Sequence, residues 1–144
     1  MRILAVDLGL ARTGLAISDM RETLASPVAT VEERDLDRLA ARIAAEATRL
    51  QAQELVVGHP RNMDGSRGES AQRAEAFARQ LEQLTGLPTA LWDERMTTMS
   101  AIGYLNQVNV RGKKRKQVVD TVSATIILQD YLDARRSRER STKS

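Results

Sequence analysis

The chain has 144 residues, of which 42% are hydrophobic and 28% are charged, so it fits one globular domain with a buried core. It contains no cysteine and one histidine, which excludes disulfides, thiolate catalysis and a zinc site built from Cys and His. The N-terminus lacks the pattern of a signal peptide and no apolar run is long enough to cross a membrane, so we expect a cytoplasmic protein with no membrane partner.

The net charge of +3 is unevenly distributed along the chain. Residues 111–144 contain ten Lys and Arg against four acidic residues, and the remainder of the chain is negatively charged. Such asymmetry favours a polyanionic partner, although a solvated tail would have the same composition.

The first third of the chain predicts three strands and a helix. Residues 2–8 and 13–18 are apolar runs joined by a turn that contains Gly, and residues 28–31 form a candidate edge strand. Apolar side chains then recur every three or four positions over residues 36–50, which predicts an amphipathic helix that begins near Asp35.

Two further strands are predicted at residues 54–58 and 89–94, where short apolar runs are typical of strands covered on both faces. Between them lies a helix that ends at Gly86. This helix is expected to turn the following side chains inward: Ala71, Ala74, Phe77, Ala78, Leu81 and Leu84.

The last part of the chain predicts a helix capped by Thr98, an exposed basic loop over residues 106–117 and a final helix. The final helix is expected to turn inward Val118, Val122, Thr125, Ile126, Gln129 and Leu132. We expect a folded domain over residues 1–136 and a basic, disordered tail over residues 137–144. Three antiparallel strands followed by alternating helices and strands predict an α/β fold, with a mixed five-stranded sheet and helices on both faces.

Acidic residues stand at strand ends that such a sheet would bring to one edge. Asp7 closes the first strand, Asp93 and Glu94 close the last, and Asp120 lies near the start of the final helix. Converging carboxylates repel one another unless a cation is present, and oxygen ligands suit Mg²⁺ or Mn²⁺. A pair of these ions can activate water and stabilise the leaving oxygen of a phosphoryl displacement, so the pattern favours phosphodiester hydrolysis.

Each acid also has a structural interpretation. Asp7 could begin a turn, Glu94 could pair with Arg95 or Arg12, and Asp120 in a first helical turn could complement the helix dipole. Only the combination of the three favours a metal site.

Cationic and polar side chains near these acids are candidates for substrate contacts. The Arg12 guanidinium could clamp a phosphate or pair with the site acids, and Asn62 could contact substrate or cap a turn in NMDGS. Aromatic residues make up only 3% of the chain, too few for a base-stacking platform, so a nucleic acid would be held by its backbone. The residues expected to track that backbone are Arg111, Lys113, Lys114 and Lys116.

Four segments together resemble the YqgF family of bacterial pre-16S rRNA nucleases, also described as Holliday junction resolvase-like. The segments are DLGLARTGLAISD, ELVVGHPRNMDGS, WDERMTT and DTVSATIILQDYLD, and the resemblance covers Met1 to about Ala134. It implies an RNase H-like fold and a metal-dependent nuclease that processes the 5′ end of pre-16S ribosomal RNA. The alternative within the family is cleavage of Holliday junctions or single strands in DNA repair and recombination.

The family motifs also imply roles for single residues. Asp7, Glu94 and Asp120 match the catalytic metal ligands, with Mg²⁺ or Mn²⁺ as cofactor. Arg95 and Thr97 follow Glu94 in WDERMTT and are expected to contact substrate. Neighbouring Asp93 stays an alternative ligand, and His59 and Arg61 depart from the more apolar family pattern without an assigned role.

Two rival functions remain open at this point. DLGLARTG resembles the strand–turn phosphate motif of actin-like and sugar-kinase ATPases, although those proteins need two lobes. A non-catalytic binder of nucleic acid would use the same basic residues. Junction cleavage would further favour a homodimer with paired sites.

Overall fold

The computed structural model describes residues 1–96 and 112–143, and within the second range the side chains of residues 121–138. Five strands form one sheet in the order β3-β2-β1-β4-β5. The central strand β1 (Arg2–Asp7) is antiparallel to β2 (Arg12–Ser18), and β2 is antiparallel to β3 (Ala25–Glu32). On its other side β1 is parallel to β4 (Ala52–His59), which is parallel to β5 (Thr89–Asp93). The predicted mixed five-stranded sheet is confirmed.

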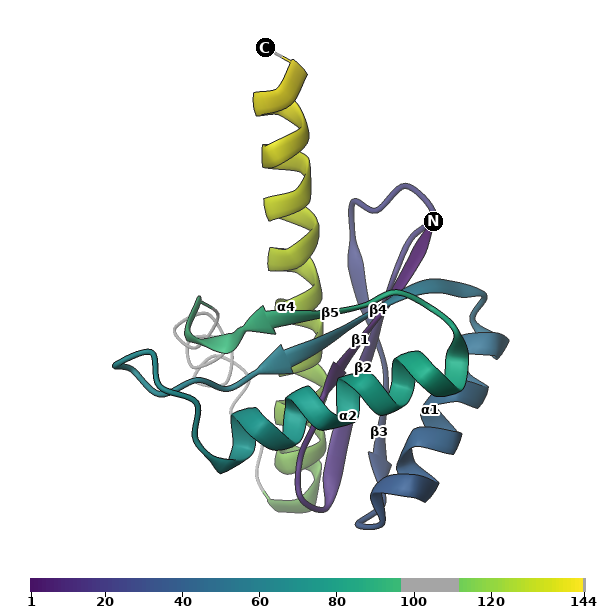
Figure 1. Ribbon diagram of the computed structural model, residues 1–144. Coiled ribbons are helices and arrows are strands. Elements are labelled where there is room, and N and C mark those ends of the chain that lie inside the picture. Colours follow the sequence, from purple (N-terminus) through teal and green to yellow (C-terminus); the bar gives the residue numbers. More distant parts are fainter. Residues whose placement is uncertain (97–111, 144) are drawn as a thin grey trace.

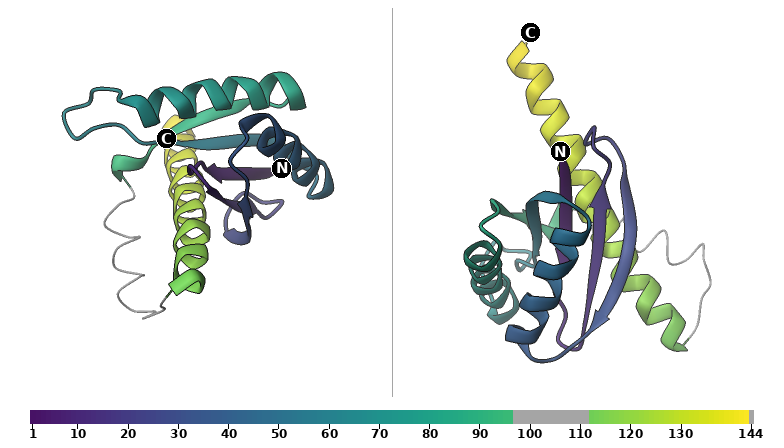
Figure 2. Two further views of the ribbon diagram at one scale, coloured as in Figure 1. Left: turned by 90° about the horizontal axis from the view of Figure 1, so that it is seen from below. Right: turned by 90° about the vertical axis from the view of Figure 1, so that its right-hand side faces the viewer.

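Helices cover both faces of this sheet (Figure 1). Helices α1 (Leu36–Arg49) and α2 (Glu69–Thr85) lie on one face, and α4 (Gly112–Lys143) crosses the other, as Figure 2 shows in its right-hand view. A 3-10 turn, η1 (Glu94–Met96), follows β5. Among the described residues, no helix combines the length and the apolar character that a membrane span requires.

The central strand feeds an apolar core on each face. Leu4 and Val6 belong to the core beneath α1 and α2, whereas Ile3 and Ala5 belong to the core beneath α4. Side chains alternate between the two faces of a strand, so a central strand covered on both sides is apolar at every position. This explains why the first strand is a continuous apolar run that ends at Asp7.

The ends of α1 and α2 follow the predicted signals. The Asp35 side chain caps α1 by accepting a hydrogen bond from the Arg38 backbone N–H at 2.9 Å. Helix α2 ends at Gly86, whose φ of 72° is left-handed and favours glycine. Leu84, predicted to face inward, is 54% exposed, so the buried row of α2 ends at Leu81.

Helix α4 differs from its prediction in two ways. It begins at Gly112, so residues 112–117 are helical rather than part of a loop; Lys, Arg and Gln favour helices but give no apolar period. Its described inward face also differs from the predicted one: Leu132 is buried, the side chain of Val118 lies outside the described residues, and the other predicted residues are only partly buried. That face consists of Ala124, Ile127, Leu128, Tyr131 and Leu132.

The C-terminal turns of α4 extend past the sheet (Figure 1). The helix continues to Lys143 and thus crosses position 136, where the sequence places the end of the folded domain. That domain boundary stays a prediction.

Candidate active site

Two of the predicted acids meet where parallel strands end. Asp7 is the last residue of β1, and the register pairs Val6 with Val57, which places Gly58 of β4 beside it. Glu94 follows β5 directly, where Asp93 pairs with His59. The carboxyl ends of β1, β4 and β5 therefore form one edge, where ligands commonly bind in α/β sheets.

Gly58 allows the Glu94 carboxyl group to lie against β4. A Cβ atom at position 58 would stand 2.9 Å from Glu94 Cδ, 3.1 Å from Glu94 Oε2 and 2.9 Å from Ile127 Cδ1. Any residue other than glycine would therefore collide with the carboxyl group and with α4. From the sequence Gly58 is predicted only as part of a strand; the signal that could have found its role is a glycine inside an otherwise apolar β-run, which often marks a close approach.

The Asp7 and Glu94 carboxyl groups lie close enough for Asp7 to act on the pKa of Glu94. Burial raises the pKa of the Glu94 carboxyl above its ordinary value; the interaction with Asp7 and the charge of His59 oppose this rise, and the charge of Asp93 adds to it. The pair is therefore a half-buried site of two carboxyl groups whose oxygens could bind a cation.

Asp93 has a different partner, which separates it from its neighbour Glu94. Arg95 donates to the Asp93 carboxylate from its backbone N–H and from Nε, each at 3.0 Å, and from Nη2 at 2.6 Å. Hydrogen bonds from Arg95 hold the pKa of Asp93 below its ordinary value. Arg95 thus pairs with Asp93, so the alternative that Glu94 pairs with Arg95 is wrong, whereas a pairing of Glu94 with Arg12 stays a prediction. Glu94 is the residue on which Asp7 acts.

The third predicted acid, Asp120, lies on α4. The adjacent Thr121 hydroxyl is 2.9 Å from the Thr30 hydroxyl. Thr30 pairs with Gly14, and Gly14 pairs with Asp7, so the three residues form one row across the sheet. With strands about 4.8 Å apart, Thr30 lies roughly 10 Å along this row from Asp7.

Asp120 also lies eight residues after the first residue of α4, so it is not in the first turn and the helix-dipole interpretation is wrong. Its side chain is outside the described residues. Among the side chains that the structure describes, no three acidic or histidine residues form a metal-binding group. The described part of the site is the pair Asp7 and Glu94, whose hard oxygen donors fit Mg²⁺ or Mn²⁺.

His59, left without a role by the sequence, is part of a polar cluster beside the acids. Its Nε2 atom is 2.6 Å from Glu75 Oε2 on α2, and Arg67 Nε lies 3.0 Å from the same oxygen. The hydrogen bond with His59 is the main cause that lowers the pKa of Glu75. This cluster fastens the end of β4 to the first turns of α2.

Asn62 lies in the loop between β4 and α2, and this loop projects beyond the ends of β4 and β5 in Figure 1. Its side-chain Nδ2 donates to Ser66 Oγ at 2.9 Å, and its backbone carbonyl accepts from the Gly65 backbone N–H at 2.8 Å. These bonds support the turn interpretation. A substrate contact by Asn62 stays a prediction, and Met63 at the loop tip is 89% exposed.

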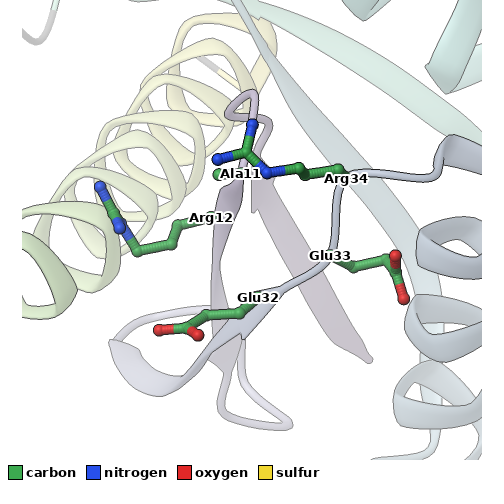
Figure 3. A pocket seen from close by; sticks show the side chains of 5 residues that line it. All are labelled: Ala11, Arg12, Glu32, Glu33 and Arg34. Carbon is green, nitrogen blue, oxygen red and sulfur yellow. The ribbon is translucent and has the colours of Figure 1, made fainter.

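Arg12 begins β2 and lines a pocket on the β3 side of Asp7 (Figure 3). In this view its guanidinium extends toward α4, and the Arg34 side chain lies over Ala11. The pocket is lined by Ala11, Arg12, Glu32, Glu33 and Arg34.

The remaining predicted substrate residues cannot be placed in the same detail. Thr97 and Arg111 are outside the described residues. Lys113, Lys114 and Lys116 lie in the first turns of α4, and only their backbone is described. Their substrate contacts stay predictions.

A family model described as RuvX, Holliday junction resolvase, matches residues 1–134. A protein of Lachnospira eligens named pre-16S rRNA nuclease is 41% identical over 138 residues, which cover 94% of this chain and 99% of that protein. A protein of the same name from Moorella thermoacetica is 42% identical and covers 92% and 95%.

Two solved structures have the same fold at low sequence identity. Thermus thermophilus RuvC in complex with a Holliday junction superposes with a TM-score of 0.62 at 13% identity, covering 95% of this chain and 96% of that one. The fowlpox virus resolvase with junction DNA superposes with a TM-score of 0.58 at 11% identity, covering 93% and 98%. The fold is therefore RNase H-like, as the resemblance implied.

Proposed function

We propose that this chain, which belongs to the RuvX family of Holliday junction resolvases, is a nuclease that hydrolyses phosphodiester bonds at the edge formed by Asp7 and Glu94. The observation that carries the proposal is the contact of these two carboxyl groups over Gly58. These residues lie 87 positions apart in the chain and meet across the end of β4, which lies between β1 and β5, and desolvation raises the pKa of Glu94. Perturbed acids of this kind are typical of catalytic sites.

Asp7, Glu94 and Asp120 would hold Mg²⁺ or Mn²⁺, and the two-metal form of this chemistry supplies an activated water and a stabilised leaving oxygen. The contribution of the chain is a rigid set of carboxylates: β1 fixes Asp7, the turn after β5 fixes Glu94, and α4 carries Asp120.

Several polar and basic side chains would bind the phosphate backbone around this edge. Arg12 lies on the β2 side of the acids, and the loop with Asn62 lies beyond β4. Their guanidinium, amide and ammonium groups suit phosphate oxygens and act without reading sequence. The remaining members of the proposed set are Arg95, Thr97, Arg111, Lys113, Lys114 and Lys116.

The substrate that we propose is the 5′ end of precursor 16S ribosomal RNA, which places the protein in ribosome biogenesis in the cytoplasm. Support comes from the names of relatives that match nearly the whole chain. The alternative is branched or single-stranded DNA, supported by the family description and by structural neighbours solved with junctions. Junction cleavage would require two sites related by two-fold symmetry, and hence a homodimer.

A cleavage panel tests this proposal. Purified protein is incubated with precursor ribosomal RNA, single strands and four-way DNA junctions, each with Mg²⁺, with Mn²⁺ and with chelator. We expect metal-dependent cleavage, with the precursor RNA cut fastest, and no cleavage by Asp7→Asn. Substrate binding without cleavage in either metal would instead support a non-catalytic nucleic-acid binder.

A further inference from the structure

A buried carboxylate lies at the opposite end of β4 from the acid site. Glu54 is 6% exposed and is held by two residues of α4. The Tyr131 hydroxyl donates to Glu54 Oε2, and Arg135 Nη2 donates to Oε1 at 2.9 Å and to Oε2 at 2.7 Å. The same guanidinium donates from Nη1 to Glu22 Oε1 at 3.0 Å, so it joins β4 to the loop between β2 and β3.

Aromatic contacts complete this group, which we call the Glu54 network (Glu22, Glu54, Tyr131 and Arg135). The Arg135 guanidinium lies 4.9 Å from the centroid of the Tyr131 ring. The Tyr131 ring packs edge-on against Trp92 of β5 at 6.0 Å. Burial raises the pKa of the Tyr131 hydroxyl to about 12, so it stays a proton donor to Glu54.

Buried ion pairs contribute little net stability, because desolvation offsets most of the attraction between the charges. What they can do is select one arrangement among several of similar apolar burial. The described inward face of α4 consists largely of aliphatic side chains on aliphatic strands, and such surfaces tolerate displacement along the helix axis. The buried Glu54 carboxylate opposes such a displacement, because it would lose the Arg135 guanidinium.

The position of α4 along its axis matters at the acid site. Tyr131 and Asp120 are separated by eleven residues, about 16 Å along a rigid helix. A displacement of one turn, about 5.4 Å, would carry Asp120 away from the row of Asp7 and would break the Thr121–Thr30 contact.

We propose that the Glu54 network is a positioning device, with Glu54, Tyr131 and Arg135 as positioning residues that fix α4 along its axis and so hold Asp120 at the edge where Asp7 and Glu94 meet. The part concerning Asp120 rests on the proposed nuclease function. The part concerning the helix does not, and it can be measured without metal or substrate.

An engineered cysteine pair reports the helix position directly. The chain has no cysteine, and the Thr30 and Thr121 hydroxyls are 2.9 Å apart, so Thr30→Cys with Thr121→Cys places two sulfurs within reach of a disulfide. The rate of disulfide formation under diamide, followed by mass spectrometry, measures how often α4 occupies its observed position.

The network is then removed by the triple substitution Glu54→Leu, Tyr131→Phe and Arg135→Met, which leaves no buried charge without a partner. We expect this variant to fold. Its disulfide should form at about one third of the rate of the cysteine pair in the native background, or more slowly still, because helix positions one turn away now compete with the observed one. The matched control is Glu46→Gln, which breaks the exposed Glu46–Arg49 ion pair on α1 and should leave the rate unchanged.

A second readout links the helix to the site. In the cysteine-free triple variant, Mn²⁺ affinity measured by calorimetry should fall about tenfold relative to the native chain, because one carboxylate is no longer held in place. If circular dichroism shows that the triple variant is unfolded, Glu54→Gln and Tyr131→Phe are tested singly with the same two readouts.

An unchanged rate of disulfide formation in a folded variant would overturn the proposal. A slower rate with unchanged Mn²⁺ affinity would overturn its link to the site. Failure of the proposed function gives a different result: the native chain would then bind no Mn²⁺, whatever the rate of disulfide formation.

Discussion

Glu54 belongs to β4 and Glu94 lies against the other end of the same strand, and the two carboxylates differ in the charge of their partners. At one end of β4, Glu54 meets a guanidinium and a phenol, so its charge is matched by the fold itself. At the other end, the half-buried Glu94 lies beside a second carboxyl group, Asp7, and desolvation raises its pKa. The partner of each acid, more than its exposure, therefore separates the structural group Glu54 from Glu94, which we propose as a cation ligand.

The largest expected effect on cleavage comes from removing the Asp7 carboxylate, at the end of β4 where Glu94 lies. Asp7→Asn should lower the cleavage rate about 10³-fold or more, because a ligand of the catalytic ion is lost. The melting temperature should not fall, since the substitution also removes the repulsion between two facing carboxyl groups. Rates and thermal melts are compared with Asp37→Asn, an exposed residue on α1 that accepts from Gln80. Equal loss in both variants would contradict the assignment.

A smaller effect is expected from displacing Glu94 without changing its chemistry. Gly58→Ala adds one carbon 2.9 Å from Glu94 Cδ, so the carboxyl group must move, and cleavage should fall roughly 10- to 100-fold. Gly68→Ala is the matched control, because its nearest neighbour would be Asn62 Nδ2 at an ordinary 3.5 Å. If the two variants cleave alike, the close approach of Glu94 to β4 has no role in activity.

The pH dependence of stability separates the two ends further. In metal-free protein a carboxyl group with a raised pKa contributes its stability fully below the ordinary value of 4.5, and this contribution is lost as the pH rises through the folded value. Glu94→Gln cannot ionise. The variant should therefore gain free energy of unfolding relative to the native chain as the pH rises above 4.5.

This prediction is measured by urea denaturation in chelator between pH 4 and pH 8. Among the described residues, Asp7 on β1, His59 on β4 and Asp93 on β5 act on the pKa of Glu94, and all three are kept in both proteins. Added Mg²⁺ should make the native chain the more stable of the two proteins, because the ion binds its folded state. Stability curves that stay parallel across this range would show that Glu94 does not ionise there.

The smallest effect concerns affinity alone. Changing Lys113, Lys114 and Lys116 together to Ala should weaken nucleic-acid binding and flatten its salt dependence by about one unit of slope per lost phosphate contact. Binding is measured by fluorescence anisotropy at several salt concentrations. Arg49→Ala, at the end of α1, is the control and should keep the native slope. A native slope in the triple variant would exclude the start of α4 from the interface.

Much of the sheet could be predicted from the sequence because its signals are local. Continuous apolar runs gave β1 and β4, and Asp35 marked the start of α1 where the structure has it. The start of α4 could not be predicted in this way, since residues 112–117 are basic and lack an apolar period.

The candidate site could be predicted only as a set of acids. Sequence could not choose between Asp93 and Glu94, because the choice depends on Arg95 turning back to Asp93 and on the space above Gly58. The Glu54 network was also missed, since its partners are 77 and 81 residues away in the chain and no local pattern joins them.

The most direct test is a crystal structure of the protein soaked in Mn²⁺, with anomalous scattering used to locate the ions. We expect an anomalous peak bound by the carboxylates of Asp7 and Glu94, with Asp120 as a further ligand, and no peak at Glu54. Full occupancy of Mn²⁺ elsewhere, with no peak beside Asp7 and Glu94, would contradict the proposed site.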